Sequence, residues 1–398
     1  SFPELSQTFV LNEITFLTDL GHDISIASLW NLKRKTIHKK IKKYGLLNKT
    51  IYLNQDIDSK KEWSNKKNFN ILKSIFKTKM SKDKQNLLNI LYDKRKNIKL
   101  ILHDFYYCSK LIKKIKEEKI DHIHCHFACY NVYLVYVVSK ILNIPYTFTT
   151  HAIDIFASPS KDIKKWANDA KKVITVSDYN KKYMMDKFGI DKKNIDVIHC
   201  GVNLNLFKPI DYNTNSQINI LSVARLVEKK GIKYLIKSCK ILKDQNINFH
   251  CSILGDGDLR NDLQKLIDKN NLKNVDLMGF VNQNKVLKEF EDSDVFVLPC
   301  IESSNGDKDG IPVSLMEAMA REVPVISTDV TGIPELIENN KNGVIVPQKD
   351  ANALAEAIVK IKKNREFADR IRKKGREKVM EEFNIEKNVK KLVNIFEI

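Results

Sequence analysis

The sequence predicts an α/β protein with two doubly wound parallel sheets that face each other across a cleft. Apolar runs of strand length alternate with amphipathic helical patterns through most of the chain, which is typical of a parallel sheet covered by helices. The alternation is interrupted once, by the polar stretch 208–217, and then restarts. A chain of 398 residues is long enough for two cores, so we expect domains over residues 1–208 and 209–384.

The first half begins with a helix, because apolar residues recur at helical spacing from Phe9 to Leu20, with Ser6 or Thr8 as N-cap. A parallel domain normally starts with a strand, so we expect about one further strand before this helix in the natural protein. Residues 30–100 are expected to form Lys-rich helices. Further strands are expected over 22–27, 120–124, 146–149, 172–176 and 195–198, and helices over 97–120, 130–142, 160–169 and 178–188.

The second half repeats the alternation, starting with a strand over 218–224. Further strands are expected over 248–253, 275–278, 294–298, 324–327 and 343–346, and helices over 231–243, 258–270, 284–290, from Pro312, near Pro334 and to the C-terminus. Ligands of such folds bind beyond the carboxyl ends of the strands. The cleft between the two sheets is therefore the expected binding site.

Composition indicates a globular protein of a reducing compartment. No apolar run has the length of a membrane span, and the longest, Val132–Val138, is expected to be the core of a helix. A signal peptide is not expected. The 7 cysteines are scattered and odd in number, which is typical of buried thiols. We therefore expect a cytoplasmic protein.

The net charge of +19 is concentrated in one segment. Residues 31–100 contain 21 Lys and Arg against 5 Asp and Glu, which gives this segment a charge of +16. Such a patch favours contact with anionic lipid, a lipid-linked phosphate or nucleic acid. Solvated surface with no partner is the alternative.

The stretch 309–324 has the features of a ligand site. Pro312 opens a helix, so the amides of Val313 and Ser314 form a positive helix end suited to a phosphate. Asp309 precedes the helix and Glu317 lies in its second turn, so both carboxylates could face one polyhydroxylated ligand. The alternative is an acidic loop followed by an ordinary amphipathic helix.

Three further positions lie at expected strand ends. Arg225 and Lys230 would lie where a diphosphate could bind, or form a solvated basic turn. Gly255 and Gly257 make a turn without the full dinucleotide fingerprint, which is either a nucleotide contact or a plain tight turn. His151 could hydrogen-bond a sugar hydroxyl or phosphate, or simply hold its loop.

A group of histidines and cysteines also lies on one expected strand and the loop after it. Alternate histidines on a strand can bind zinc, but no second ligand pair follows at a usual spacing. We therefore expect no metal and a structural role for these residues. They are His122, His124, Cys125, His126 and Cys129.

With these residues identified, the chain resembles the retaining glycosyltransferases of family 4, which have the GT-B architecture, particularly bacterial exopolysaccharide and colanic-acid-type members. The resemblance spans nearly the whole chain and is specific for the family, though not for one substrate. It is carried by F-P-E-L-S-Q-T-F-V-L-N-E-I at 2–14, H-C-H-F-A at 124–128, T-H-A-I-D-I-F at 150–156, V-S-D-Y-N at 176–180, C-G-V-N-L-N-L-F-K-P at 200–209, A-R-L-V-E-K-K-G at 224–231, G-D-G-D-L-R at 255–260 and D-G-I-P-V-S-L-M-E-A-M-A at 309–320.

The resemblance implies transfer of a sugar from a nucleotide sugar with retained anomeric configuration, without metal, cofactor or enzymatic nucleophile. Arg225 and Lys230 would bind the donor diphosphate, Asp309 would contact sugar hydroxyls, Glu317 the donor ribose, and His151 the sugar or its phosphate. Donor contacts are also implied for Gly255, Gly257, Phe280, Gly310, Ile311, Val313 and Ser314, and acceptor contacts for Ser6 and Thr8.

The family pattern also assigns roles to the two halves and shows two departures. The first half would bind the acceptor, the second the nucleotide sugar, and helix 385–398 would pack back on the first half. Asp309 stands where most relatives have Glu, and this shorter side chain bears on which sugar is held. Gln7 also stands where relatives usually have Glu.

The leading hypothesis is a cytoplasmic glycosyltransferase at the inner face of the membrane, extending a glycan or polyprenyl-linked acceptor for cell-surface polysaccharide. A nonhydrolysing nucleotide-sugar epimerase of the same architecture is an alternative, and it would need no acceptor. A nucleic-acid-binding protein is another, but it leaves the cleft motifs unexplained and the basic segment has few aromatic residues. We therefore expect no nucleic-acid partner.

Overall fold

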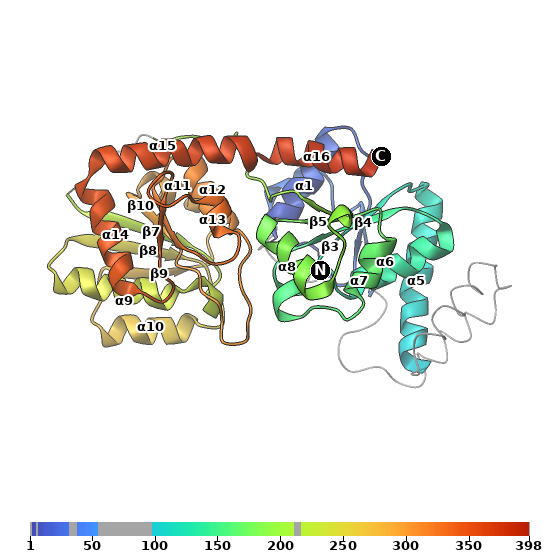
Figure 1. The fold of residues 1–398 in the computed structure, drawn as a ribbon, viewed down its shortest axis with the longest axis horizontal. Helices are drawn as coiled ribbons and strands as arrows, with labels where there is room; N and C mark the ends of the chain where they lie inside the picture. The colour runs from blue at the N-terminus through green and yellow to red at the C-terminus, as the bar shows by residue number, and fades with distance from the viewer. Residues whose placement is uncertain (1, 5–6, 32–37, 55–97, 211–215, 398) are drawn as a thin grey trace.

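The computed structural model describes residues 2–4, 7–31, 38–54, 98–210 and 216–397. These residues form two large parallel sheets, each covered by helices and lying side by side along the long axis of the molecule (Figure 1), and one small two-stranded sheet. The predicted α/β fold with two parallel sheets is therefore confirmed. Among the described helices, none is both long and apolar enough to cross a membrane.

The first half contains a four-stranded parallel sheet in the order β3-β4-β5-β6. Helix α6 lies across this sheet, and its residues Val132–Val138 are all buried, as the apolar run predicts. The strands are β3 (Ile123–His126), β4 (Tyr146–Thr150), β5 (Lys172–Thr175) and β6 (Ile195–Val197). The helices are α1 (Thr8–Asp19), α5 (Ile98–Glu118), α6 (Tyr130–Leu142), α7 (Ile163–Asp169) and α8 (Asp178–Phe188), with a π-helix η1 (Ile153–Ala157) and a short η2 (Lys192–Asn194).

Two further strands, β1 (Ile26–Ser28) and β2 (Thr50–Tyr52), form a separate parallel pair. The expectation of helices throughout 30–100 is wrong at β2, a short β-branched and aromatic run for which pairing with β1 outweighs the helical character of its neighbours. Helix α2 (Lys39–Lys43) does form within the segment. Residues 32–37 and 55–97 of the segment lie outside the described part of the chain.

Two strands begin later than the sequence indicated, for the same reason. His22 and Ile120 were expected in strands, but each closes the preceding helix: His22 N donates to Leu17 O at 3.2 Å and Ile120 N to Ile115 O at 3.0 Å. Such bonds, from an amide five residues after the carbonyl, are the usual C-terminal closure of a helix. A residue that closes a helix just before a strand is thus easily mistaken for the start of the strand.

The second half contains a six-stranded parallel sheet in the order β12-β11-β10-β7-β8-β9. The chain builds outward from β7 in one direction and then returns to build from β10 in the other, so β7 and β10 are neighbours. The strands are β7 (Ile218–Val223), β8 (Phe249–Leu254), β9 (Val275–Gly279), β10 (Val295–Val297), β11 (Val325–Thr328) and β12 (Val344–Val346). The helices are η3 (Glu228–Lys230), α9 (Ile232–Asp244), α10 (Arg260–Lys269), α11 (Gln283–Glu291), α12 (Val313–Ala320), α13 (Ile333–Leu336), α14 (Ala351–Lys363) and α15 (Arg365–Glu382).

The last helix, α16 (Ile385–Glu397), returns to the first half and lies beside α1 (Figure 1). Its apolar face packs with Leu17 of α1, and Asn388 Nδ2 donates to His199 O at 3.0 Å. Gly201 lies against this helix so closely that a Cβ atom there would come within 2.4 Å of Ile385 Cα. The C-terminus therefore connects the two sheets through α15 and α16.

Candidate active site

Two of the expected donor-binding residues, Lys230 and Asp309, meet where β7 and β10 end side by side. A crevice forms at such a point of a doubly wound sheet because the connections after the two strands run in opposite directions. Lys230 follows β7 and Asp309 follows β10, and their side chains form an ion pair of 2.7 Å. Lys229 joins them, with its Nζ 2.9 Å from Asp307 and 3.9 Å from Asp309.

Both members of this ion pair are charged at neutral pH. Burial alone would raise the pKa of Asp309, but Lys230 and Lys229 outweigh it and lower the pKa below its ordinary 3.8. Burial likewise opposes the charge on Lys230, and Asp309 outweighs it, so the pKa of Lys230 is raised above 10.5. The Cys300 thiol donates to Asp309 Oδ2 at 3.5 Å, and burial raises the pKa of this thiol well above its ordinary value.

Gly231 allows the lysines to approach the loop after β10. Its φ is +65°, and a Cβ atom would come within 1.8 Å of Pro299 O. The neighbouring backbone is fixed by a hydrogen bond of 2.9 Å from Ile301 N to Lys229 O. Only glycine fits both the left-handed conformation and the close approach, so it positions Lys229 and Lys230.

The glycines after β8 have a packing role. A Cβ atom on Gly255, whose φ is +131°, would come within 1.9 Å of Ala224 O, and one on Gly257 within 2.6 Å of Leu226 O. These contacts alone account for the tight turn, and a donor contact at either glycine stays a prediction. Phe280 follows β9 at the same end of the sheet, and its side chain is 62% exposed.

Helix α12 begins one residue later than the sequence indicated. Pro312 is its N-cap, with φ −63° and ψ 126°, and Val313 is the first helical residue. The amides of Val313 and Ser314 donate to no backbone or side-chain acceptor among the described residues, as expected at a helix start. Glu317 has no ion-pair partner among the described residues, and burial raises its pKa from 4.5 to about 8.

His151 lies at the end of β4, held by its backbone. His151 N donates to Asp154 Oδ1 at 3.0 Å, and Asn180 Nδ2 of α8 donates to His151 O at 2.8 Å. The ring lies 4.5 Å from the Phe127 ring and 4.7 Å from the Phe9 ring, centroid to centroid. Burial lowers the pKa of His151 well below 6.5, so the ring is neutral at physiological pH.

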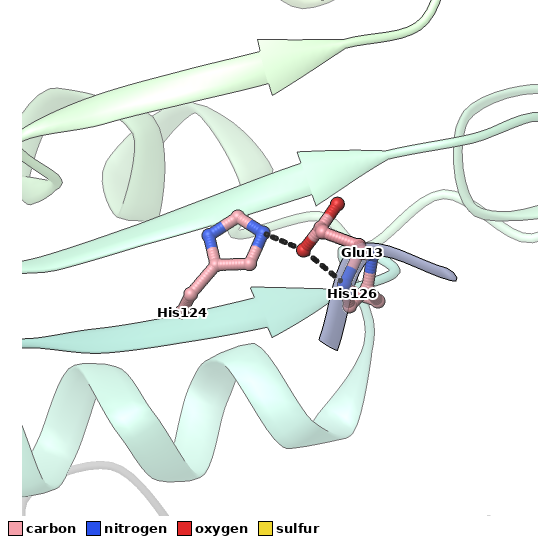
Figure 2. A group of neighbouring side chains, drawn as sticks. All are labelled: Glu13, His124 and His126. Carbon is pink, nitrogen blue, oxygen red and sulfur yellow. Dashed lines mark hydrogen bonds and ion pairs between the residues drawn. The ribbon is translucent and has the colours of Figure 1, made fainter. Parts of the chain in front are cut away.

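The histidines of β3 surround a carboxylate from α1 (Figure 2). Glu13 Oε1 lies 3.0 Å from His126 Nε2 and 3.8 Å from His124 Nε2, and the three ligand atoms lie within 4.8 Å of one another. Both nitrogens of His124 contact hydroxyls, Thr147 Oγ1 at 2.7 Å and Thr149 Oγ1 at 3.0 Å. The observed contacts are therefore those of a hydrogen-bonded cluster.

The two halves touch beside this region. Glu335 of α13 accepts hydrogen bonds from the amides of Asp178 and Tyr179, at 2.9 and 2.8 Å, and so caps helix α8 of the first half. A Cβ atom on Gly332 would come within 2.8 Å of Ser177 Cβ. The ends of the two sheets that carry the predicted residues thus face each other.

Comparison with known proteins places the chain in a family. The profile described as "Glycosyltransferase Family 4" matches residues 79–206, and that described as "Glycosyl transferases group 1" matches residues 208–378. WcaL of Escherichia coli (strain K12), a glycosyltransferase named for colanic acid biosynthesis, is 31% identical over 393 residues, covering 96% of this chain and 94% of the relative. The chain belongs to glycosyltransferase family 4.

Other relatives agree with this membership. The amylovoran biosynthesis glycosyltransferase AmsK of Erwinia amylovora is 30% identical over 412 residues, covering 100% of this chain and 97% of the relative. An Escherichia coli enzyme named UDP-Gal:alpha-D-GlcNAc-diphosphoundecaprenol alpha-1,3-galactosyltransferase is 26% identical over 324 residues, covering 76% of this chain and 81% of the relative.

Solved glycosyltransferase structures share the fold. One from Rickettsia africae ESF-5 has a TM-score of 0.72 at 21% identity and covers 98% of this chain and 93% of its own. Anabaena HepE in complex with UDP-glucose has a TM-score of 0.62 at 16% identity, and the match covers 79% of this chain and 96% of HepE. These structures agree with the fold, and membership of family 4 makes the chain a glycosyltransferase, which decides against the epimerase and the nucleic-acid-binding protein.

The structure brings together some of the residues expected at the candidate site, leaves others apart, and adds neighbours that sequence reasoning missed. Lys230 and Asp309 meet as a pair, whereas Arg225 is exposed and has no ion-pair partner among the described residues. Thr8 begins α1, and Ser6 lies outside the described residues. Sequence reasoning assigned no role to Lys229, Glu13 or Glu335. Glu13 and Lys229 lie within the family stretches 2–14 and 224–231, and this was the one indication of a role for either residue. Glu335 lies in none of these stretches.

Proposed function

We propose that this family-4 glycosyltransferase moves a sugar, with retained configuration, from a nucleotide sugar to a glycan or polyprenyl-linked acceptor in cell-surface polysaccharide synthesis. The donor would lie at the crevice between β7 and β10, and the acceptor between this crevice and His151. The observation that carries the proposal is the largely buried Lys230–Asp309 pair at the end of these two strands.

The charges of the crevice suit departure of a nucleoside diphosphate. Cations and backbone dipoles aimed at the leaving group lower the barrier most when they are fixed before the reaction. Lys230 is fixed by Asp309, Arg225 is exposed nearby, and the α12 amides at Val313 and Ser314 have no acceptor among the described residues. A diphosphate would take up these cations and donors, leaving Asp309 to accept from sugar hydroxyls.

Glu317 suits a ribose because it is a carboxyl group with no protein partner in the described structure. At neutral pH its raised pKa leaves it protonated, so it both donates and accepts hydrogen bonds. A ribose offers hydroxyls that do the same. The HepE complex with UDP-glucose supports a uridine nucleotide as the first donor to test.

The acceptor and the membrane contact rest on the relatives and on the basic segment. The galactosyltransferase relative is named for a diphosphoundecaprenol-linked acceptor. In the described part of the segment, helix α2 buries Ile41 and exposes Lys39, Lys42 and Lys43. Lysines on a surface helix attract anionic lipid. We place the enzyme at the cytoplasmic face of the membrane on this basis.

Thermal shift across nucleoside diphosphates and nucleotide sugars identifies the donor, and product analysis with lipid-linked acceptors then tests transfer. Lys230→Ala and Glu317→Ala should abolish transfer while the protein stays folded. Lys233→Ala, an exposed lysine of α9, is the matched control and should keep wild-type turnover. Full turnover by Lys230→Ala and Glu317→Ala would refute the donor site. An inverted anomeric configuration in the product would refute retention.

A further inference from the structure

A chain of hydrogen bonds connects three residues from three elements of the first half. Glu13 Oε1 of α1 lies 3.0 Å from His126 Nε2 at the end of β3. The other nitrogen of that ring, His126 Nδ1, lies 3.3 Å from His151 Nε2 beyond β4. The two rings are stacked, with centroids 5.5 Å apart and an interplanar angle of 26°.

The direction of each hydrogen bond follows from counting protons. A carboxylate only accepts, so an ionised Glu13 requires the proton of His126 on Nε2. With a single ring proton, placed on Nε2, His126 has a bare Nδ1, which also only accepts. His151 Nε2 must therefore carry its ring proton, and His151 Nδ1 is left with a free lone pair.

The ionisation states of Glu13 and His151 agree with this count. Burial alone would raise the pKa of Glu13, but His126 and then His124 outweigh it, and the pKa lies below 4.5. Burial keeps His151 neutral. The three hydrogen-bonded residues and the titratable groups packed against them lie on α1, β3, η1 and the loops after β4 and β6. They are Glu13, His124, His126, His151, Asp154, His199 and Cys200.

The free nitrogen of His151 is open to a ligand. His151 Nδ1 has no hydrogen-bond partner among the described residues, and it is not sealed from solvent. His122 Nδ1, by contrast, is both unpaired and fully buried. Asp154 and Asn180 hold the His151 backbone, so the ring is restricted in position. The ring is therefore held in place, with Nε2 hydrogen-bonded to His126 and Nδ1 available to a ligand.

We propose that Glu13 and His126 are positioning residues that hold His151 in the Nε2–H tautomer, so that its Nδ1 accepts a hydrogen bond from a substrate hydroxyl. This rests on the proposed function, in which His151 faces the substrates. A lone pair is attracted to a hydroxyl and repelled by phosphate oxygens. His151 thus recognises a sugar hydroxyl, of donor or acceptor, and the phosphates are left to the second half.

Glu13→Gln removes the group that fixes the direction of these hydrogen bonds, with almost no change in shape. The glutamine amide can accept from His126 Nε2–H through its oxygen or donate to a bare His126 Nε2 through its nitrogen, so it holds neither tautomer of His126. When it donates, the proton of His126 lies on Nδ1, His151 Nε2 must accept, and His151 offers a donor from Nδ1 in place of an acceptor. His126→Asn is the matched rescue, because its amide oxygen stands near the position of Nδ1 and can still accept from His151 Nε2–H.

Ring ¹⁵N chemical shifts of the ¹⁵N-histidine-labelled full chain report the tautomer without any substrate, with His151→Gln used to assign the signals. We expect a protonated Nε2 and bare Nδ1 on His151 in the wild type and in His126→Asn, and a mixture of both tautomers in Glu13→Gln. Wild-type His151 protonated on Nδ1, or a Glu13→Gln variant with an unchanged tautomer, would overturn the proposal. So would one equivalent of bound zinc per chain, measured by mass spectrometry, because a metal would use the same nitrogens.

Turnover then tests the positioning role. Glu13→Gln should lower kcat in proportion to the fraction of His151 that carries its proton on Nδ1, with little change in the KM for the nucleotide sugar. His126→Asn should keep most of the wild-type kcat. A mixture of His151 tautomers with unchanged kcat overturns the positioning role. If the tautomers are as expected but the wild type transfers no sugar, the proposed function fails and the tautomer assignment stands.

Discussion

Replacing Glu317 by glutamine should stabilise the protein at alkaline pH and leave its stability in acid nearly unchanged. Burial raises the pKa of Glu317 from 4.5 to about 8, so the folded protein keeps a proton that the unfolded chain releases at lower pH. A raised carboxyl pKa contributes its full stability below about pH 4.5, and this contribution is lost as the pH rises toward about 8. Glutamine carries no ionisable proton and avoids the loss.

The interval between the pKa values of the unfolded and folded states sets the size of the difference in unfolding free energy. At about 1.4 kcal/mol per pH unit, the span from 4.5 to about 8 corresponds to at most about 5 kcal/mol. The Glu317 side chain is half-buried rather than sealed, so solvent screening should reduce this to about 2 kcal/mol. For one domain, that corresponds to a rise in Tm of roughly 5 °C at alkaline pH.

Calorimetry of the wild type and Glu317→Gln between about pH 5 and about pH 9 measures the difference directly. The Tm of the variant should exceed that of the wild type by an amount that grows with pH. Glu356→Gln, on the exposed face of α14, is the matched control and should show no such trend. Parallel Tm curves for Glu317→Gln and wild type would refute the inference that this carboxyl group is protonated in the folded protein.

Three further predictions concern the crevice and the contact between the halves. Asp309→Asn leaves Lys230 buried without its partner, so urea unfolding should show a loss of about 3 kcal/mol, and an unchanged midpoint would contradict the ion pair. Gly231→Ala places a Cβ 1.8 Å from Pro299 O and should reduce stability by at least about 3 kcal/mol, measured in the same way. Glu335→Gln weakens the cap on α8, and small-angle scattering should show a larger radius of gyration; unaltered scattering would mean that Glu335 does not hold the halves together.

Local sequence pattern was enough for most helices and strands. The strand expected over 218–224 is β7, and the helix expected over 231–243 is α9, because periodicity and turn residues act over a few neighbours. It failed at β2, whose three residues are defined by pairing with β1, and at His22 and Ile120, which close helices. In each failure the deciding contact is a backbone hydrogen bond that no side-chain pattern encodes.

The sequence by itself determined the α/β class, the family and the residues at the ends of β7 and β10. The tertiary structure decided that these strands are neighbours, so that Lys230 meets Asp309, and that Glu13, His126 and His151 form one chain of hydrogen bonds. Glu13 and His126 lie 113 residues apart. Strand order and burial depend on contacts between distant segments, whereas helix and strand propensity acts locally. For this reason only the folded chain shows which ionisable groups lie together in the protein interior.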